Sequence, residues 1–376
     1  MAKLEKKEGA AELENSPVLQ ERKRRGSRKK KCGSALGTVL FVFLALVLMI
    51  GLGLLSLSNR MLNQIERVDK SEETWIAPEE AEREMRETEE LEREPAEDGT
   101  MAERSDTITP EDVAWTRPKE VRQKPRVRNI LLIGQDRRPG ETRARSDSMI
   151  LCSINEYTKE LTLTSFMRDM YVPYPGEYYP SRMNHAFAWG GMSLLDQLIE
   201  EDFGVTIDGN VVVDFDGFVQ VMDMIAPLEI DLRDEEAWYM NLGNKSWMLH
   251  TGVNALNGEQ ILSYARLRYV GRSDWERTER QRRVLSLAFD KVKNMSLTEL
   301  TDLANAALPC MTTDMSNAEI MNCLYTVATN RMQIGETHRL PVEGTYTAEV
   351  IYGMDVLVPD LEKNSEYLHR YIYGQM

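Results

Sequence analysis

An uninterrupted apolar run occupies residues 33–58 and contains no Asp, Glu, Lys or Arg. A helix needs about 20 such residues to cross a bilayer, so the run predicts one membrane span. Residues 22–31, just before it, include eight Lys or Arg. Positive charge favours the cytosolic side, which predicts a cytosolic N-terminus and an extracellular remainder. A cleaved signal peptide has the same layout, but its apolar core is shorter. We therefore expect an uncleaved anchor in the cell membrane.

Charge divides the rest of the chain into parts with different expected roles. Residues 1–32 form a basic tail, which anionic lipid of the inner leaflet explains. Residues 59–125 carry 20 acidic and 11 basic side chains, with few apolar residues at core spacing, so we expect an exposed acidic extracellular stalk. Residues 126–376 carry 24 basic and 36 acidic side chains. Such an acidic outer part repels a nucleic-acid backbone, so we expect no nucleic-acid partner.

From residue 126 onward, short apolar runs alternate with segments of helical spacing. Strands are predicted at residues 129–134, 148–154, 161–165, 210–215 and 228–232, with edge strands at 340–342 and 350–352. Helices are predicted at residues 183–201, 217–225, 257–265, about 274–294, 296–307, 316–330 and 361–373. The polar piece 233–251 is expected to be a loop or lid. This order predicts an α/β fold: a layered α-β-α domain with a mixed central sheet over residues 126–294, completed by residues 295–376.

The four cysteines and four histidines show no metal-ligand spacing, so we expect no zinc site. The sequence does not decide whether Cys310 and Cys323 form a disulfide. Cys152 lies in an apolar run and is expected to be a small core residue.

Residues 266–283 are unusually rich in arginine, with seven Arg and no Lys in 18 residues. The planar guanidinium group donates two parallel hydrogen bonds to a phosphate, so the stretch suggests an anion site. Arg277, Arg280 and Gln281 would share one helix face, whereas Arg266 and Arg268 align only where the chain leaves the helix. The alternatives are a solvated, salt-bridged helix face and a nucleic-acid site.

Charged residues also occur at the ends of the first three predicted strands. Asp136 follows the first strand, Arg145 and Asp147 precede the second, and Arg168 and Asp169 follow the third. Ligand sites in open α/β sheets lie at strand ends, where carboxylates can hold a divalent cation and arginines can hold phosphate. Each group also has a structural explanation as a turn cap or a local ion pair.

With these residues, the chain resembles the LytR-CpsA-Psr family of membrane-anchored cell-wall enzymes. The resemblance covers about residues 128–294 and consists of seven motifs in consistent order. They are Asn129-Ile-Leu-Leu-Ile-Gly-Gln-Asp136, Arg145-Ser-Asp-Ser-Met149, Ser165-Phe-Met-Arg-Asp169, Asn184-His-Ala-Phe-Ala-Trp-Gly-Gly191, Val213-Asp-Phe-Asp-Gly-Phe218, Leu256-Asn-Gly-Glu-Gln260, and Tyr264-Ala-Arg-Leu-Arg268 with Arg277-Thr-Glu-Arg-Gln281. Arg182 stands where the family usually has lysine.

The resemblance implies a phosphotransferase that moves a glycopolymer, with one phosphate, from a polyprenyl diphosphate lipid to a peptidoglycan hydroxyl. Mg²⁺ or Mn²⁺ would be held by Asp136 and Asp147, and the lipid tail would enter the apolar space between sheet and helices. The residues expected to bind the diphosphate are Arg145, Arg168, Arg266, Arg268, Arg277, Arg280 and Gln281. Catalytic roles are expected for Arg168, Asp147 and Asp274, while the proton acceptor is left open among Asp147, Asp169 and Asp274.

Two other functions stay open at this level. Relatives have been labelled transcription attenuators, which would require a cytosolic DNA-binding module, yet the predicted cytosolic part has no helix-turn-helix pattern. A non-catalytic protein that binds polyprenyl lipid or wall glycan is the other alternative. Which glycopolymer is transferred, and to which wall acceptor, does not follow from the sequence.

Overall fold

The computed structural model describes residues 59–92, 106–135, 137, 143–268, 270–271 and 274–374. The predicted tail and the predicted span at residues 33–58 lie outside these residues. No helix in the described part of the chain is long and apolar enough to cross a membrane. The elements below belong to the unit Leu62–Met376.

A mixed seven-stranded sheet lies at the centre, in the order β1-β10-β7-β2-β3-β4-β11. Its strands are β1 (Glu66–Arg67), β2 (Val127–Gln135), β3 (Ser146–Asn155), β4 (Glu160–Phe166), β7 (Gly209–Asp214), β10 (Met311–Thr313) and β11 (Gln333–Leu340). β3 is antiparallel to both β2 and β4, whereas β7 and β11 run parallel to β2 and β4. The predicted α/β fold with a mixed central sheet is therefore confirmed.

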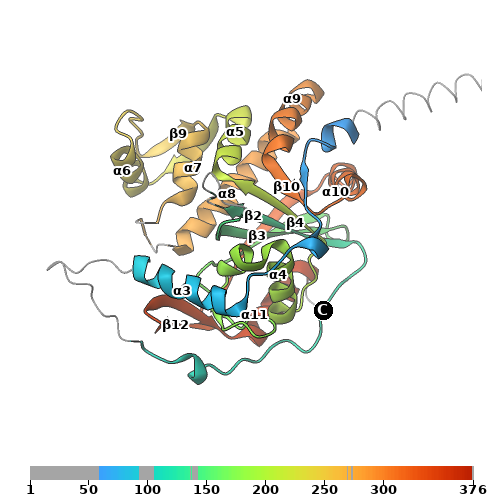
Figure 1. Ribbon diagram of the computed structural model, residues 1–376. Coiled ribbons are helices and arrows are strands. Elements are labelled where there is room, and N and C mark those ends of the chain that lie inside the picture. Colours follow the sequence, from blue (N-terminus) through green and yellow to red (C-terminus); the bar gives the residue numbers. More distant parts are fainter. Residues whose placement is uncertain are drawn as a thin grey trace, which may run out of the picture. The chain divides into compact units, whose positions relative to one another are not determined.

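Helices cover both faces of the sheet, with α4 and α11 on one face and α5, α7 and α8 on the other (Figure 1). The helices are α3 (Pro78–Glu92), α4 (His185–Phe203), α5 (Phe215–Ile225), α6 (Asp234–Gly243), α7 (Gly258–Arg266), α8 (Asp274–Lys293), α9 (Leu297–Ala307), α10 (Asn317–Thr329) and α11 (Leu361–Tyr373). α4 ends where the sequence predicted, because Gly204 adopts the left-handed conformation with φ 66°. Its side chains Leu195 and Leu198 pack with Leu131 and Leu151 of the sheet in one buried cluster.

The piece expected to be a loop or lid, residues 233–251, begins instead with helix α6. Its first turn holds Asp234, Glu235 and Glu236, which the helix dipole favours at an N-terminus. Only Glu236, Ala237 and Met240 are buried in it, too few to give a helical apolar pattern in the sequence. β8 (Leu228–Leu232) is also not in the central sheet, because it pairs with β9 (Gly252–Leu256) in a separate hairpin.

The described part of residues 62–92 packs on the domain, which differs from the exposed stalk that its composition predicts. β1 joins the central sheet by pairing with β10. Lys70 lies between two carboxylates, with its Nζ 2.7 Å from Oδ2 of Asp196 and 2.7 Å from Oδ2 of Asp314. These two acids come from α4 and from the residue after β10, so Lys70 ties the segment to both.

The sequence hides this packing because the apolar contacts are sparse. In α3 only Ala81 and Met85 are buried among the described side chains, one turn apart on a highly charged helix. Glu73 accepts hydrogen bonds from the backbone N–H groups of Met192 and Ser193, at 3.2 and 2.8 Å. It thereby caps the second half of α4 after the kink at Gly191.

Residues 295–376 contribute to the central sheet and to its helical cover. β11 extends the sheet beside β4, and α11 packs against α4. A hairpin of β12 (Tyr346–Ile351) and β13 (Met354–Pro359) lies outside the central sheet. Cys310 and Cys323 are free thiols.

Candidate active site

Strand ends bring several of the predicted polar residues to one edge of the central sheet. Gln135 at the end of β2 pairs with Ser146 at the start of β3. β4 is the antiparallel neighbour of β3 on its other side, so its end lies at the same edge. Asp147 is the second residue of β3, and Arg168 and Asp169 follow β4.

At this edge, two carboxylates are surrounded by three arginines. Oδ1 of Asp147 is 3.1 Å from Nη1 of Arg168 and 3.3 Å from Nη2 of Arg268. Oδ1 of Asp274 is 2.9 Å from Nη2 of Arg277 and 3.6 Å from Nε of Arg168. We call these five residues the guanidinium cluster. Its members come from β3, from the residues after β4, from the residues just after α7 and from α8, so the structure brings together residues from two of the predicted strand ends and from the arginine-rich stretch.

The three arginines determine the ionisation of Asp147. Burial alone would raise the pKa of this carboxyl, but Arg168, Arg277 and Arg268 hold the pKa below its ordinary value. Burial, together with the charges of Arg168 and Arg268, lowers the pKa of Arg277 to about 10, so Arg277 stays cationic at neutral pH. Three cations then face two carboxylates, and the excess positive charge suits a phosphate group.

Asp169 and Asp274 are neighbouring carboxyls that both contact Arg168, whose Nε is 3.4 and 3.6 Å from their Oδ1 atoms. Burial raises the pKa of Asp169, and the nearby charge of Asp274 raises it further. Burial also opposes ionisation of Asp274, but Arg168 and Arg277 outweigh it and lower the pKa of that carboxyl. The ionised form is therefore favoured more at Asp147 and Asp274 than at Asp169.

Helix α8 runs from the guanidinium cluster to the apolar residues of the interior. Asp274, Arg277 and Gln281 occur at spacings of three and four residues, and Gln281 Oε1 accepts a hydrogen bond from Ser148 Oγ at 3.2 Å. Val284 and Leu285 follow one turn further along. A single helix thus presents a carboxylate, a guanidinium, an amide and then an apolar surface.

Next to Gln281, an apolar cavity of about 300 Å³ lies between the sheet and the helices α5, α7 and α8. Its walls are mostly aliphatic, and its few polar groups include Ser148, Gln281 and Arg266. Gly134 at the end of β2 also lines it, where a Cβ atom would lie 3.2 Å from that of Ser148. The remaining lining residues are Leu132, Ile133, Ile150, Val211, Val213, Asp214, Phe215, Phe218, Val221, Met222, Leu262, Ala265, Val284, Leu285 and Met311.

Two other predicted diphosphate residues lie near the cluster but not within it. The guanidinium carbon of Arg266 is 4.1 Å from the ring centroid of Phe215, so Arg266 stacks on a wall of the apolar cavity. Arg145 is half-buried and is close enough to the buried His185 to help lower the pKa of that imidazole, after the larger effect of burial.

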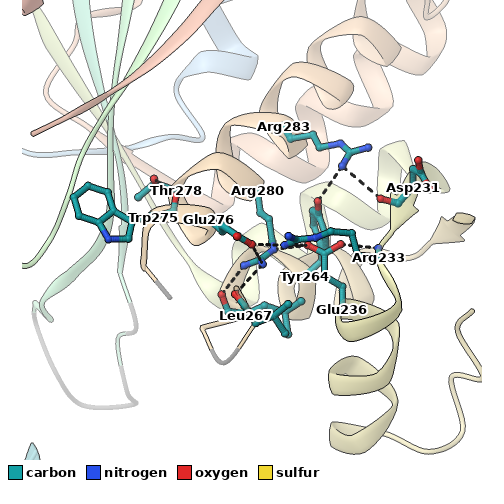
Figure 2. Close-up of polar contacts among 11 residues, drawn as sticks. Asp231, Arg233, Glu236, Tyr264, Leu267, Trp275, Glu276, Thr278, Arg280 and Arg283 are labelled. Carbon is teal, nitrogen blue, oxygen red and sulfur yellow. Dashed lines mark hydrogen bonds and ion pairs between the residues drawn. The ribbon is translucent and has the colours of Figure 1, made fainter. Parts of the chain in front are cut away.

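Arg280 points away from the guanidinium cluster into a separate ion-pair network, shown in Figure 2. Its Nε is 2.8 Å from Oε1 of Glu236, and its Nη2 is 3.0 Å from Oε2 of Glu276. Its Nη1 and Nη2 also donate to the backbone carbonyls of Leu267 and Val270, at 2.9 and 3.3 Å. Arg280 is 3% exposed, and these contacts place it outside the guanidinium cluster. Its contacts fix the loop that carries Arg268.

The predicted metal ligands are Asp136 and Asp147, and Asp136 lies outside the described residues. Asp147 fits the role of a ligand, because its carboxyl is held ionised and hard cations prefer carboxylate oxygen. The described residues contain no group of three or more His, Cys, Asp or Glu side chains placed to hold a metal ion.

Two residues to which the sequence assigned no role lie in the site. Ser148 Oγ donates a hydrogen bond to Gln281 Oε1. Arg182 pairs with Asp169, with its Nε 3.8 Å from Oδ1 of that carboxyl. Both stand in or next to the quoted motifs, but their contacts depend on which segments meet in space, which the spacing alone does not reveal.

Comparison with known proteins identifies the family of this chain. The profile of the LytR_cpsA_psr family matches residues 93–370. The chain is 30% identical over 194 residues to the polyisoprenyl-teichoic acid–peptidoglycan teichoic acid transferase TagU of Enterococcus faecalis, a match that covers 50% of this chain and 61% of TagU. It is 27% identical over 219 residues to the regulatory protein MsrR of Staphylococcus aureus, covering 58% of this chain and 65% of MsrR. The match thus spans less than two thirds of either relative.

A solved structure of similar fold is the LytR-CPS2A-psr family protein YwtF (TagT) with bound octaprenyl pyrophosphate lipid. It has a TM-score of 0.51 and 22% sequence identity, and the match covers 69% of this chain and 99% of that chain. The family profile extends over most of the chain. The chain therefore belongs to the LytR_cpsA_psr family.

Proposed function

We propose that this protein transfers a glycopolymer, together with one phosphate, from a polyprenyl diphosphate lipid to a hydroxyl of peptidoglycan. The observation that carries the proposal is the position of the guanidinium cluster at one end of the apolar cavity. A polyprenyl diphosphate joins a long apolar chain to an anionic headgroup, and the two sites match these two parts in the same order along α8.

The comparisons support the same donor class. TagU is named as a teichoic acid transferase that uses a polyisoprenyl-linked substrate, and the TagT structure contains an octaprenyl pyrophosphate. Because this chain belongs to the same family, we expect its guanidinium cluster to bind a donor of the same class.

In the proposed reaction, the acceptor hydroxyl oxygen attacks the phosphorus that bears the glycopolymer. A new P–O bond forms, and the bond to the bridging oxygen breaks, so polyprenyl monophosphate leaves with the electron pair. Arg168, Arg268 and Arg277 stabilise the negative charge that develops on the phosphoryl oxygens, because their positions are fixed before the reaction. The hydroxyl proton passes to a carboxylate, for which Asp147 and Asp274, with their lowered pKa values, are better suited than Asp169, whose pKa is raised.

Asp136 and Asp147 would hold a Mg²⁺ or Mn²⁺ ion. Such an ion, when bound, would neutralise part of the charge of the diphosphate. Gln281, Arg145 and Arg266 would contact the headgroup from the side of the cavity. The apolar run at residues 33–58 would anchor the protein in the membrane and hold the site within reach of a lipid-embedded donor.

The proposal is tested by ligand discrimination. The full-length protein in detergent is titrated with a short polyprenyl diphosphate, the matching monophosphate and the matching alcohol, and binding is followed by tryptophan fluorescence. We expect the diphosphate to bind most tightly and the alcohol least. Arg168→Ala should remove most of this preference, and Arg283→Ala, in the same arginine-rich stretch but outside the cluster, should keep it. Equal affinity for all three ligands would overturn the proposed headgroup site.

A further inference from the structure

A second cavity, of about 260 Å³, lies at the opposite end of the guanidinium cluster from the apolar cavity. Asp169 and Asp274 line it, and Arg168 contacts both of these carboxyls, with Nε at 3.4 and 3.6 Å from their Oδ1 atoms. The β12–β13 hairpin supplies most of its other walls, through Ala348, Glu349, Val350, Asp355, Val356 and Leu357. We call it the hairpin cavity.

The residues of α8 show where the hairpin cavity lies relative to the apolar cavity. Asp274 and Trp275, at the start of the helix, line the hairpin cavity, whereas Gln281 and Val284 line the apolar cavity. At 1.5 Å per residue, Asp274 and Val284 are about 15 Å apart along the axis. Arg277 lies between them. A phosphate held by the guanidinium cluster therefore has an apolar cavity on one side and the hairpin cavity on the other.

Phosphoryl transfer needs the attacking oxygen and the leaving oxygen roughly in line on opposite sides of the phosphorus. In the proposed reaction the leaving group is the polyprenyl phosphate, whose tail would occupy the apolar cavity. The attacking hydroxyl must then approach from the opposite side. In the order of sites along α8, the hairpin cavity lies on that side.

The chemistry of the walls suits a hydroxyl-rich ligand and disfavours an anionic one. Four carboxyl groups line the cavity, those of Asp169, Asp274, Glu349 and Asp355, and none of its lining residues is Lys or Arg. Carboxylate oxygens accept hydrogen bonds from sugar hydroxyls but repel phosphates. The described residues contain no group of three or more His, Cys, Asp or Glu placed to hold a metal ion, so a metal site does not account for the four carboxyl groups of the hairpin cavity.

The walls are held in place by contacts that tie the hairpin to the catalytic segment. The N–H of Leu357 donates to the carbonyl of Asp169 at 2.9 Å, and Nη2 of Arg182 donates to the carbonyl of Asp355 at 2.9 Å. On the outer side, Thr107 Oγ1 donates to Glu349 Oε2 at 2.7 Å. The cavity is therefore a formed part of the fold beside Arg168.

Resting on the proposed function, we infer that the hairpin cavity is the subsite for the acceptor: one uncharged sugar ring of the wall glycan, whose hydroxyl faces Asp274. The acceptor oxygen would form the new P–O bond and give its proton to the Asp274 carboxylate as polyprenyl monophosphate leaves. At about 260 Å³, the cavity lies below the roughly 300–1,000 Å³ usual for ligand pockets, so it suits one ring of a longer chain.

The test fills the hairpin cavity without touching the cluster. Ala348 lines the cavity, whereas Thr347 is its exposed neighbour in β12 and does not line it. Full-length Ala348→Trp and Thr347→Trp proteins are assayed in detergent with a short-chain polyprenyl diphosphate disaccharide as donor and an uncrosslinked glycan fragment as acceptor. We expect Ala348→Trp to raise the KM for the acceptor at least about tenfold, the size of effect of about 1.4 kcal/mol, with unchanged donor affinity. Thr347→Trp should leave both unchanged.

Unchanged donor affinity also shows that the Ala348→Trp protein is folded; if affinity is lost, Ala348→Leu repeats the test with a smaller side chain. An unaltered acceptor KM in a variant that binds donor normally would overturn the acceptor subsite and leave the proposed function intact. If the wild-type protein binds the donor but forms no conjugate with any glycan, the proposed function itself fails.

Discussion

Arg277 and Arg280 are three residues apart on one helix, yet their guanidinium groups have different partners. Arg277 contacts Asp274 in the cluster, whereas Arg280 is enclosed by Glu236, Glu276 and two loop carbonyls (Figure 2). The helical spacing correctly placed Arg277 and Gln281 beside each other. The same spacing could not show that Arg280 has other partners than Arg277, because its partner Glu236 lies on α6, a helix that the sequence did not predict.

Arg280→Ala should destabilise the fold, because it removes the buried guanidinium paired with the Glu236 carboxylate and leaves that carboxylate only the more exposed Arg233. Breaking a buried ion pair in this way costs about 3–5 kcal/mol. We expect urea unfolding to show a loss of this order, and hydrogen exchange to show faster opening near Leu267. Arg283→Ala provides the control, since Arg283 is exposed and its hydrogen bonds to Asp231 and Tyr264 are long, at 3.4 Å. Unchanged stability of Arg280→Ala would contradict the structural role.

Asp147→Asn should change how stability depends on pH. The folded pKa of Asp147 lies below its ordinary value of about 3.9. The ion pairs of Asp147 therefore contribute stability above about pH 4, and that contribution is lost as the pH falls through the folded pKa. Urea unfolding from pH 6 to pH 2.5 should show a steeper acid loss for wild type than for Asp147→Asn. Parallel curves would mean that Asp147 is not paired with the arginines.

At the scale of elements, strong local patterns were predicted well. The apolar strands β2 and β3 and the helices α4, α7 and α11 lie where the sequence placed them, because each has a clear apolar period or a cap. α6 and β9 were not predicted, because each buries only two or three side chains, whereas β8 lies at the predicted strand 228–232 but pairs with β9 outside the central sheet. The apolar cavity was expected, but its lining depends on this packing.

Ala265→Phe tests whether the apolar cavity holds the lipid tail. Ala265 is on α7 and lines the cavity, so a phenyl ring there would take up space meant for the chain. We expect affinity for a long polyprenyl diphosphate to fall about tenfold or more, while a donor with a very short chain loses less. Ala288→Phe on α8 is the control, because Ala288 is also buried but does not line the cavity. An equal loss for long and short donors would place the tail elsewhere.

At the scale of the molecule, the acidic segment before residue 126 was the largest departure from expectation. Its composition predicts a solvated stalk, but its described part supplies a strand, a helix cap and the Lys70 ion pairs. Composition averages over many exposed charges and therefore conceals the few residues that pack.

Lys70→Met should destabilise the fold by a few kcal/mol, because Asp196 and Asp314 lose their shared cation while remaining largely buried. Burial raises the pKa of Asp196 to about 7 even with Lys70 present. Protonation of this carboxyl at low pH removes its unpaired charge, so the penalty should be smaller at pH 5 than at pH 8. Thermal unfolding at the two pH values measures this. A penalty independent of pH, or none at all, would show that the segment does not depend on these pairs.

The most direct test of the account is the mass of the products formed from a defined donor. The full-length protein is incubated with a polyprenyl diphosphate saccharide and a glycan acceptor, and the products are identified by mass spectrometry. We predict polyprenyl monophosphate and a glycan conjugate that carries one phosphate, with the rate reduced on the order of 10²-fold in Arg168→Ala and kept in Arg283→Ala. Release of polyprenyl diphosphate with a phosphate-free conjugate, or full activity of Arg168→Ala, would contradict the account.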